Sequence, residues 1–253
     1  MTSAENRYSI RAYYEALYRA WGPQHWWPAR TRFEVIVGAY LTQNTSWKNV
    51  EIALRRMRTA HLLSIDAIRT IPLKKLKAVI RPAGYYRQKA ERLKTFVAFV
   101  DHRYEGSLHR LFAQPTTQLR EELLSLNGVG PETADSILLY AGQHPVFVVD
   151  AYTRRIAERH GIASAETKYD ELRELFERAL GVVKPAKLRT ESQEQETGFR
   201  PNPRSPSRMS QARRSPVVQI YNDMHGLIVA VGKHYCLKAT PRCEGCPLQA
   251  FLF

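Results

Sequence analysis

A short segment, Leu126–Asp135, constrains the fold more than any other, because two glycines and a proline stand within four positions at its centre. A helix over 116–124 is predicted to end before it, and a second to begin at Pro131, since proline suits the first helical turn. Gly128 and Gly130 allow positive φ angles and close approach of the backbone. The segment predicts either an ordinary helical hairpin or one whose backbone N–H groups, around Gly128, Val129, Gly130 and Thr133, bind a phosphate oxygen.

Most of the remaining chain carries apolar residues at helical spacing. The clearest stripes begin at Ile10, Val50, Tyr86, Leu172 and Val217. Phe33–Leu41 is apolar almost all round, which predicts a central buried helix. Period-two runs are rare, and His144–Val149 is the best candidate for a strand. The sequence therefore predicts an all-α protein.

The charge of the chain favours a polyanionic partner. The 253 residues hold 38 Lys and Arg against 24 Asp and Glu, for a formal net charge of +14. Nucleic acid and an anionic membrane surface both fit this imbalance, and nucleic acid is the better match at this charge. No run of about 18 apolar residues suggests a membrane span. The polar Met1–Tyr8 does not resemble a signal peptide, so a cytoplasmic, nucleoid-associated protein is expected.

A second motif lies eighteen residues after Glu132. The hairpin followed by Val149-Asp150 and then Arg155 resembles the helix-hairpin-helix (HhH-GPD) DNA glycosylases of the endonuclease III superfamily. This resemblance implies base-excision repair of double-stranded DNA. It also implies that Asp150 stabilises the positive charge developing on the sugar and helps to orient the attacking water. Asp150 alone could equally be the N-cap of the next helix, and the two roles are compatible.

The resemblance extends to two further loops. Leu41–Thr45 matches the loop that carries a DNA-entering glutamine, here Gln43, and Ile80–Ala90 matches a second DNA-facing loop that contains Tyr85. By this match, Gln43 and Tyr85 fill the gap that an extruded base leaves in the duplex.

Within the superfamily, the chain most resembles the 3-methyladenine DNA glycosylase III branch. The resemblance rests on Trp26-Trp27-Pro28, on Trp47, and on Lys233 after a His-Gly pair. It implies that these five residues shape a base pocket and that Trp47 stacks on an alkylated purine, helped by cation–π attraction. The tryptophans could instead be core residues, and Lys233 could be a solvated lysine at a helix C-terminus.

The hairpin also bears on the reaction. Superfamily members that cut the backbone carry a Schiff-base lysine at the position of Glu132, and a carboxylate cannot form an imine. The expected activity is therefore monofunctional hydrolysis of the N-glycosidic bond of alkylated purines such as 3-methyladenine. The alternatives are an endonuclease III-like glycosylase and AP lyase on oxidised pyrimidines, with a lysine from elsewhere, and a non-catalytic protein that binds damaged DNA.

All three cysteines of the chain stand near its end. Cys236, Cys243 and Cys246 keep the first three spacings of the endonuclease III pattern, which implies a [4Fe–4S] cluster. The fourth position is Leu252, so the cysteine set is incomplete. A foreign fourth ligand such as His234, a three-iron cluster, zinc, and a relic without metal are the open alternatives.

The resemblance implies two helical lobes in one monomeric protein. Residues 30–143 would form a six-helix lobe with the helix-hairpin-helix, and residues 1–29 with 144–253 a second lobe. Within the second, residues 186–216 lack apolar period and hold Pro, Ser, Gln and Arg. They predict a disordered basic linker, either a solvated connection or a DNA-binding arm.

Overall fold

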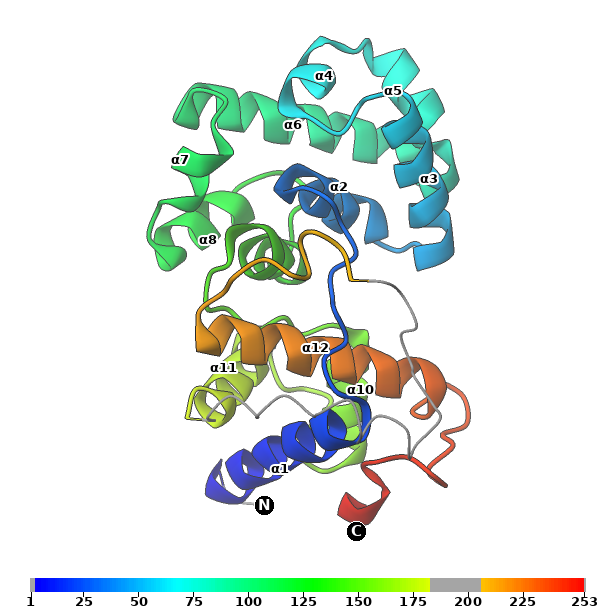
Figure 1. Ribbon diagram of the computed structural model, residues 1–253, viewed down its shortest axis with the longest axis vertical. Coiled ribbons are helices and arrows are strands. Elements are labelled where there is room, and N and C mark those ends of the chain that lie inside the picture. The colour runs from blue at the N-terminus through cyan, green and yellow to red at the C-terminus, as the bar shows by residue number, and fades with distance from the viewer. Residues whose placement is uncertain (1–2, 183–205, 253) are drawn as a thin grey trace. The chain divides into compact units, whose positions relative to one another are not determined.

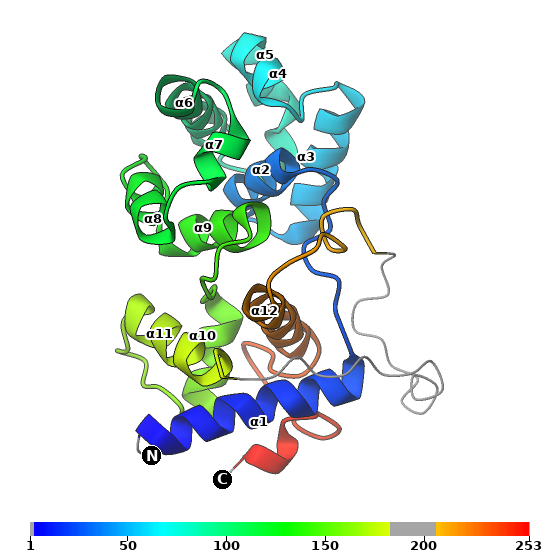
Figure 2. The ribbon, with the colours of Figure 1, turned by 60° about the vertical axis from the view of Figure 1, so that its left-hand side comes forward.

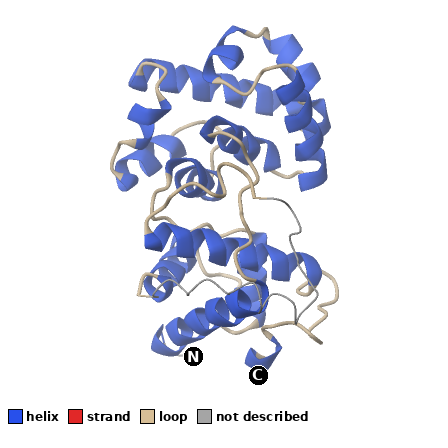
Figure 3. Cartoon of the chain, in the orientation of Figure 1, coloured by secondary structure: helices blue, strands red, loops and turns tan. Residues whose placement is uncertain are grey.

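The computed structural model describes residues 3–182 and 206–252, and within those ranges every regular element is a helix (Figures 1 and 3). The predicted all-α class is confirmed. The predicted strand His144–Val149 is wrong, because this segment has neither helical nor strand geometry.

The chain divides into two units. One is Pro28–His144, and the other combines Met1–Trp27 with Pro145–Phe253. The predicted boundary of the contiguous lobe was 30–143. Within the described residues, no helix is long and apolar enough to cross a membrane.

The unit Pro28–His144 is built around a helix that is buried on all sides. α2 (Arg32–Thr42) has every residue from Phe33 to Leu41 buried, as the apolar run predicts. Thr31 caps it by accepting a hydrogen bond from the backbone N–H of Glu34. The other helices of the unit are α3 (Trp47–Thr59), α4 (Ile65–Thr70), α5 (Leu73–Val79), η1 (Arg81–Ala83), α6 (Tyr86–Tyr104), α7 (Leu108–Phe112), α8 (Thr116–Leu124), α9 (Pro131–Ser136) and η2 (Ile137–Gly142).

The unit therefore holds eight α-helices, α2 to α9, where six were expected. The number six is what the resemblance implied, and several of the eight helices are short. α4, α5 and α7 have seven residues or fewer, which is too short for a repeated apolar stripe.

The other unit consists of α1 (Ser3–Trp21), α10 (Ala151–Arg159), α11 (Tyr169–Leu180), α12 (Pro216–His234) and the short η4 (Gln249–Phe251). Figure 2 shows α10, α11 and α12 grouped beside α1, and the contacts between these helices agree. α12 is buried continuously from Ile220 to Gly232. At Gly232 its backbone lies so close to α10 that a Cβ there would meet the ring of Tyr152 at 2.1 Å.

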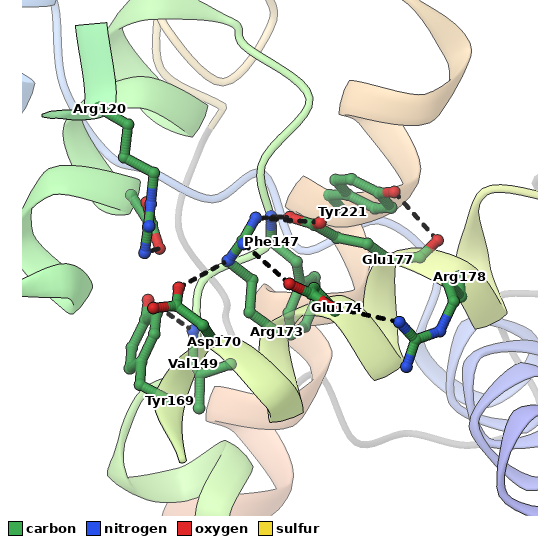
Figure 4. A network of polar contacts seen from close by, with 11 residues as sticks. Arg120, Phe147, Val149, Tyr169, Asp170, Arg173, Glu174, Glu177, Arg178 and Tyr221 are labelled. Atoms are coloured by element: carbon green, nitrogen blue, oxygen red, sulfur yellow. Dashed lines mark hydrogen bonds and ion pairs between the residues drawn. The ribbon is translucent and has the colours of Figure 1, made fainter. Parts of the chain in front are cut away.

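The segment before α10 is held by side chains of α11 instead of by a neighbouring strand. Glu177 accepts a hydrogen bond from the backbone N–H of Phe147 at 2.9 Å and pairs with Arg173 at 3.1 Å (Figure 4). The Tyr169 hydroxyl accepts from the N–H of Val149 at 3.3 Å. These contacts satisfy buried backbone donors without a sheet, which is why the alternating apolar run is not a strand.

The predicted disorder of 186–216 is wrong for its last third. Met209 and Ser210 are buried, and Pro216 is the first residue of α12. Arg214 donates to the carbonyl oxygens of Met209 and Ser210, and Ser207 Oγ donates to the Trp27 carbonyl oxygen at 3.1 Å. One buried methionine and backbone hydrogen bonds order this stretch, and neither produces an apolar period. Residues 186–205 lie outside the described residues.

Candidate active site and nucleic-acid interface

The predicted hairpin is present at the predicted residues. α8 ends at Leu124, Gly128 takes a φ of 80°, and α9 begins at Pro131 with Gly130 as its N-cap. Val129 is buried and donates its N–H to the Leu126 carbonyl oxygen at 3.0 Å. The buried carboxylate of Asp135 on α9 accepts two hydrogen bonds from the guanidinium of Arg120 on α8, at 2.7 and 3.2 Å. The two helices are thus tied together beside the turn.

Gln43 lies against this hairpin. Its amide nitrogen donates to the Gly128 carbonyl oxygen and to Thr133 Oγ1, both at 2.9 Å. Its amide oxygen accepts from Arg92 at 2.8 Å. The sequence placed Gln43 in a DNA-facing loop, and the structure adds that the same side chain braces the hairpin.

Arg92 is a residue that sequence reasoning missed. Its guanidinium covers Gly128 so closely that a Cβ on that glycine would lie 1.9 Å from Arg92 Nε. Gly128 is therefore favoured by its positive φ, and a side chain at this position would also have to displace Arg92. In the sequence, Arg92 is a single cation beside the apolar residues of α6, and nothing distinguishes it from an ordinary surface arginine.

Tyr85 stands exposed at the N-terminus of α6. It is 67% exposed, and its φ of 46° is unusual for a residue other than glycine. Thr45 Oγ1 donates to the Ala83 carbonyl oxygen in this loop. An exposed aromatic ring at a fixed position suits contact with the bases of DNA.

Lys89 stands in the predicted DNA-facing loop Ile80–Ala90, where the sequence assigned it no role, and it joins the Tyr85 loop to the Gln43 loop. Its buried ammonium donates to the carbonyl oxygens of Leu41 and Ala83, each at 2.9 Å, and to Thr45 Oγ1 at 2.8 Å. Burial and the neighbouring charge of Arg92 lower the pKa of Lys89 to about 8. Three hydrogen bonds from the Lys89 ammonium thus hold together the Gln43 loop and the Tyr85 loop, both of which were predicted to face DNA.

Asp150 is the N-cap of α10, one of the two roles considered for it. Its Oδ1 accepts from the backbone N–H of Thr153 at 2.8 Å and from Thr153 Oγ1 at 3.0 Å. Its Oδ2 lies 3.5 Å from His225 Nε2. The cap fixes the orientation of the carboxylate through one oxygen, which leaves the second oxygen directed toward His225.

His225 and Thr153 hold Asp150 as an anion. Burial raises the pKa of Asp150, but the proximity of His225 and the hydrogen bonds from Thr153 outweigh it, so the pKa lies below its ordinary value. The Asp150 side chain is 13% exposed and that of His225 is 6% exposed. An ionised carboxylate at a nearly buried site can stabilise positive charge much more than it could in bulk water.

Trp26 and Trp27 lie outside any helix, and each is only 6% exposed. Their rings are 5.6 Å apart, and Lys233 Nζ lies 5.3 Å from the centre of the Trp26 ring. Lys233 is exposed in the last turn of α12, and its role in a base pocket stays a prediction. Gly226 lets α12 approach this segment, since a Cβ there would lie 3.1 Å from that of Trp26.

Pro28 and Trp47 belong to the other unit. Pro28 precedes α2, and Trp47 is the first residue of α3. Both are half-buried. Their proposed role in a base pocket stays a prediction.

The three cysteines line one cavity of about 290 Å³. The other residues around it are Arg159, His160, Val231, Tyr235, Pro241, Arg242, Leu248, Gln249 and Leu252. Burial and the proximity of the other two thiols raise the pKa of Cys246. Among the described residues, no three His, Cys, Asp or Glu side chains converge on a single-ion site.

The helix that begins at Asp150 also holds the cysteine loop. Arg155 donates to the Cys236 carbonyl oxygen at 2.8 Å, and Arg159 donates to Cys236 Sγ at 3.3 Å and to the Leu237 carbonyl oxygen at 2.7 Å. Arg155, the last residue of the sequence motif, thus connects α10 to the cysteine loop. His234, the suggested fourth ligand, is exposed and is not among the residues around the cavity.

The model of the HhH-GPD superfamily of base excision DNA repair proteins matches residues 37–181. The chain belongs to this superfamily and is a DNA glycosylase of base excision repair.

Individual relatives agree with this assignment. A protein of Methanocaldococcus jannaschii, whose name assigns it to the DNA repair glycosylases, is 42% identical over 98% of this chain and 97% of its own. Endonuclease III of Thermotoga maritima is 25% identical over 86% of this chain and 80% of its own. Helicobacter pylori 3-methyladenine DNA glycosylase bound to 1,N6-ethenoadenine matches with a TM-score of 0.67 and 28% identity, over 92% and 98% of the chains. A DNA complex of endonuclease III shares the fold, with a TM-score of 0.69 at 19% identity over 100% and 95%.

The two hairpin glycines are expected to respond differently to alanine. A Cβ on Gly130 meets nothing within 4 Å and its φ is −92°, so Gly130→Ala should keep the stability of the protein. The methyl group would occupy the space through which a phosphate approaches, and DNA binding should weaken about tenfold, or ~1.4 kcal/mol.

Gly128→Ala should instead lower the free energy of unfolding by about 1–3 kcal/mol, because alanine is strained at this positive φ and its methyl group displaces Arg92. Fluorescence anisotropy and thermal denaturation separate the two effects, and unchanged binding by Gly130→Ala would contradict the phosphate role.

Proposed function

We propose that the protein is a monofunctional glycosylase that hydrolyses the N-glycosidic bond of alkylated purines such as 3-methyladenine. The observation that carries this proposal is the fixed carboxylate of Asp150, anionic and nearly buried, with one oxygen used by the helix cap. The resemblance to a 3-methyladenine glycosylase over nearly the whole chain supports the substrate class.

The expected reaction needs no covalent intermediate with the protein. As the bond between C1′ and the base nitrogen breaks, its electron pair leaves with the base and positive charge develops on the sugar. The Asp150 carboxylate stabilises that charge and orients a water molecule toward C1′. The water oxygen forms the new bond to C1′, and its proton passes to Asp150 Oδ2, which lies beside His225. The products are the free base and an abasic site.

Glu132 supports simple hydrolysis. It is exposed in the first turn of α9, where a carboxylate is favourable to the helix dipole. A carboxylate has no amine with which to form a Schiff base, so the hairpin lacks the nucleophile of a glycosylase/lyase.

The proposed base pocket needs aromatic surface on which a purine can stack. Trp26 and Trp27 supply aromatic surface, and Lys233 already covers one face of Trp26. Trp47, the first residue of α3, is the residue proposed to stack on the purine.

A glycosylase panel tests the proposal. Duplexes with a single methylated, oxidised or deaminated base are incubated with the protein, and released base and strand cleavage are measured separately. We expect release of alkylated purines, with strand cleavage only after alkali. Release of oxidised pyrimidines together with a borohydride-trapped covalent adduct would overturn the proposal and favour the endonuclease III-like alternative. Binding of every duplex without release of any base would favour a damage-binding protein.

We propose further that Cys236, Cys243 and Cys246 hold an iron–sulfur cluster. Three thiols around one cavity fit three cluster ligands, and a cuboidal cluster needs more room than one ion. The chain has no fourth cysteine, and Leu252 in the fourth position offers no ligand atom. The cluster would cross-link the C-terminal loop. Arg155 and Arg159 of α10 already hold this loop through hydrogen bonds to its carbonyl oxygens.

The cluster is expected to be visible in the isolated protein. Anaerobic purification should give broad visible absorption, with iron and acid-labile sulfide bound to the chain. Cys243→Ala should lose most of both, because it removes one of three thiolates. Stoichiometric zinc without labile sulfide, or neither metal, would contradict the cluster.

A further inference from the structure

A strongly basic hollow lies in the unit Pro28–His144, away from the hairpin contacts described above. It has a volume of about 720 Å³ and is lined by Arg56, Leu73, Lys74, Lys77, Ala78, Arg81, Tyr86 and Arg87. Five of these eight residues are cationic, and none carries a carboxylate. The hollow draws on α3, α5, η1 and the start of α6, which pack against one another (Figure 1).

Ordinary helix stabilisation explains only part of this charge. Arg56 and Lys77 stand in the last turns of α3 and α5, where a cation is favourable to the helix dipole. Lys74 and Arg87 stand in the first turns of α5 and α6, where a cation is unfavourable. Neither first turn contains an acidic residue, and no side chain caps either helix.

A second hollow in the same unit shows the contrast. It is lined by Arg103, His109 and Arg110 among other residues, and its cations are neutralised. Arg103 pairs with Glu122 at 2.8 Å, and Arg110 pairs with Glu105. Of the five cations around the first hollow, Lys77 pairs with Glu91, which lies outside the lining. The concentration of positive charge at the first hollow therefore points to an external anion.

The exposed Tyr85 lies between lining residues of the hollow along the chain. Arg81 begins η1, and Tyr86 and Arg87 follow Tyr85 in the first turn of α6. A strand whose bases meet Tyr85 would thus pass its next phosphates toward these side chains. Phosphate contacts of this kind position a protein on DNA without reading sequence.

We propose that this hollow binds the backbone phosphates of the DNA flank beyond the position of Tyr85. The proposal rests on DNA binding by the protein and adds an anchoring surface that is separate from the hairpin and from Asp150. Lys74, Arg81 and Arg87 are the anchoring residues, because they are exposed and none of them stands in the last turn of an α-helix.

The test compares two triple variants of equal net charge. The first is Lys74→Gln/Arg81→Gln/Arg87→Gln. The control is Arg69→Gln/Arg103→Gln/Arg110→Gln, whose cations stand in last turns and pair with carboxylates. Each variant lowers the formal charge by three, from +14 to +11. Circular dichroism establishes that both are folded.

Binding to an undamaged duplex is measured by anisotropy between 50 and 200 mM salt. Loss of three phosphate contacts should make the slope of log K against log salt shallower by roughly 2.7. Between 50 and 200 mM salt, the affinity of the wild type should therefore fall by about 40-fold more than that of the first variant. The control should keep the wild-type slope. Equal changes in both variants, or an unchanged slope in the first, would overturn the proposal.

A second measurement is independent of the size of the slope. Duplexes with a fixed abasic site are shortened on one side and then on the other, and wild type is compared with the first variant. The affinity difference should vanish when one particular flank is removed and persist when the other is removed. A difference that survives both truncations would overturn the flank assignment. Excision is scored separately, so failure of the proposed glycosylase activity leaves this result readable.

Discussion

Asp150→Asn is expected to lower the rate of base release, measured in a single turnover with enzyme in excess, by about 10²–10⁴-fold. The substitution removes the negative charge that faces the developing cation and removes the group that accepts the proton of water. It keeps the shape of the side chain. Because asparagine is as good an N-cap as aspartate, α10 should still begin at residue 151.

The same variant separates catalysis from folding and binding. DNA affinity should remain within a few-fold of wild type, since Asp150 contributes no positive charge to the interface. Asp170→Asn, which also removes one carboxylate from the first turn of a helix, is the matched control and should leave excision unchanged. Normal excision by Asp150→Asn would instead show that the carboxylate serves the fold alone.

The pKa of Asp150 fixes the direction of the pH dependence. It lies below the ordinary value in the folded protein, so near pH 4 the unfolded chain binds more protons than the folded one. The stabilisation from the ionised carboxylate is therefore complete above pH about 3.9 and is lost as pH falls through the folded pKa. Denaturation of wild type and Asp150→Asn should converge below pH 4, and a wild-type advantage that grew there would contradict this assignment.

The sequence was sufficient for the parts of the fold that depend on local rules. Gly128, Gly130 and Pro131 define a turn through backbone conformation, and both flanking helices occur at the predicted residues. Phe33–Leu41 is buried throughout, as an apolar helix without a polar face must be. Such features need no knowledge of what lies beside them.

Features that depend on tertiary partners were not predictable. The apolar run before Asp150 resembles a strand until Glu177 and Tyr169 supply its hydrogen bonds. Residues 206–216 have the composition of a disordered linker, and the burial of Met209 that orders them is visible only in the structure. The same limit applies to the site: Asp150 was identified from a motif, but His225, 75 residues further along the chain, is brought to it by the packing of α12.

Lys89 is expected to be the polar side chain on which the DNA-facing loops most depend. Lys89→Met keeps the apolar stem but removes three hydrogen bonds, and it leaves the carbonyl oxygens of Leu41 and Ala83 without this donor. Since a buried polar group that loses its partner costs about 1–3 kcal/mol, the free energy of unfolding should fall by about 1–3 kcal/mol. Chemical denaturation measures this loss directly.

The control for Lys89→Met is available on the same helix. Lys94→Met removes one hydrogen bond, from Nζ to the Arg69 carbonyl oxygen at 3.0 Å, at an exposed position. It should change the free energy of unfolding by no more than about 0.5 kcal/mol. Hydrogen exchange should accelerate at residues 41–45 and 83–85 in Lys89→Met alone, because the ammonium joins those two loops. Equal effects of the two substitutions would mean that the loops are held by the apolar core of α6, and that the buried ammonium adds nothing to them.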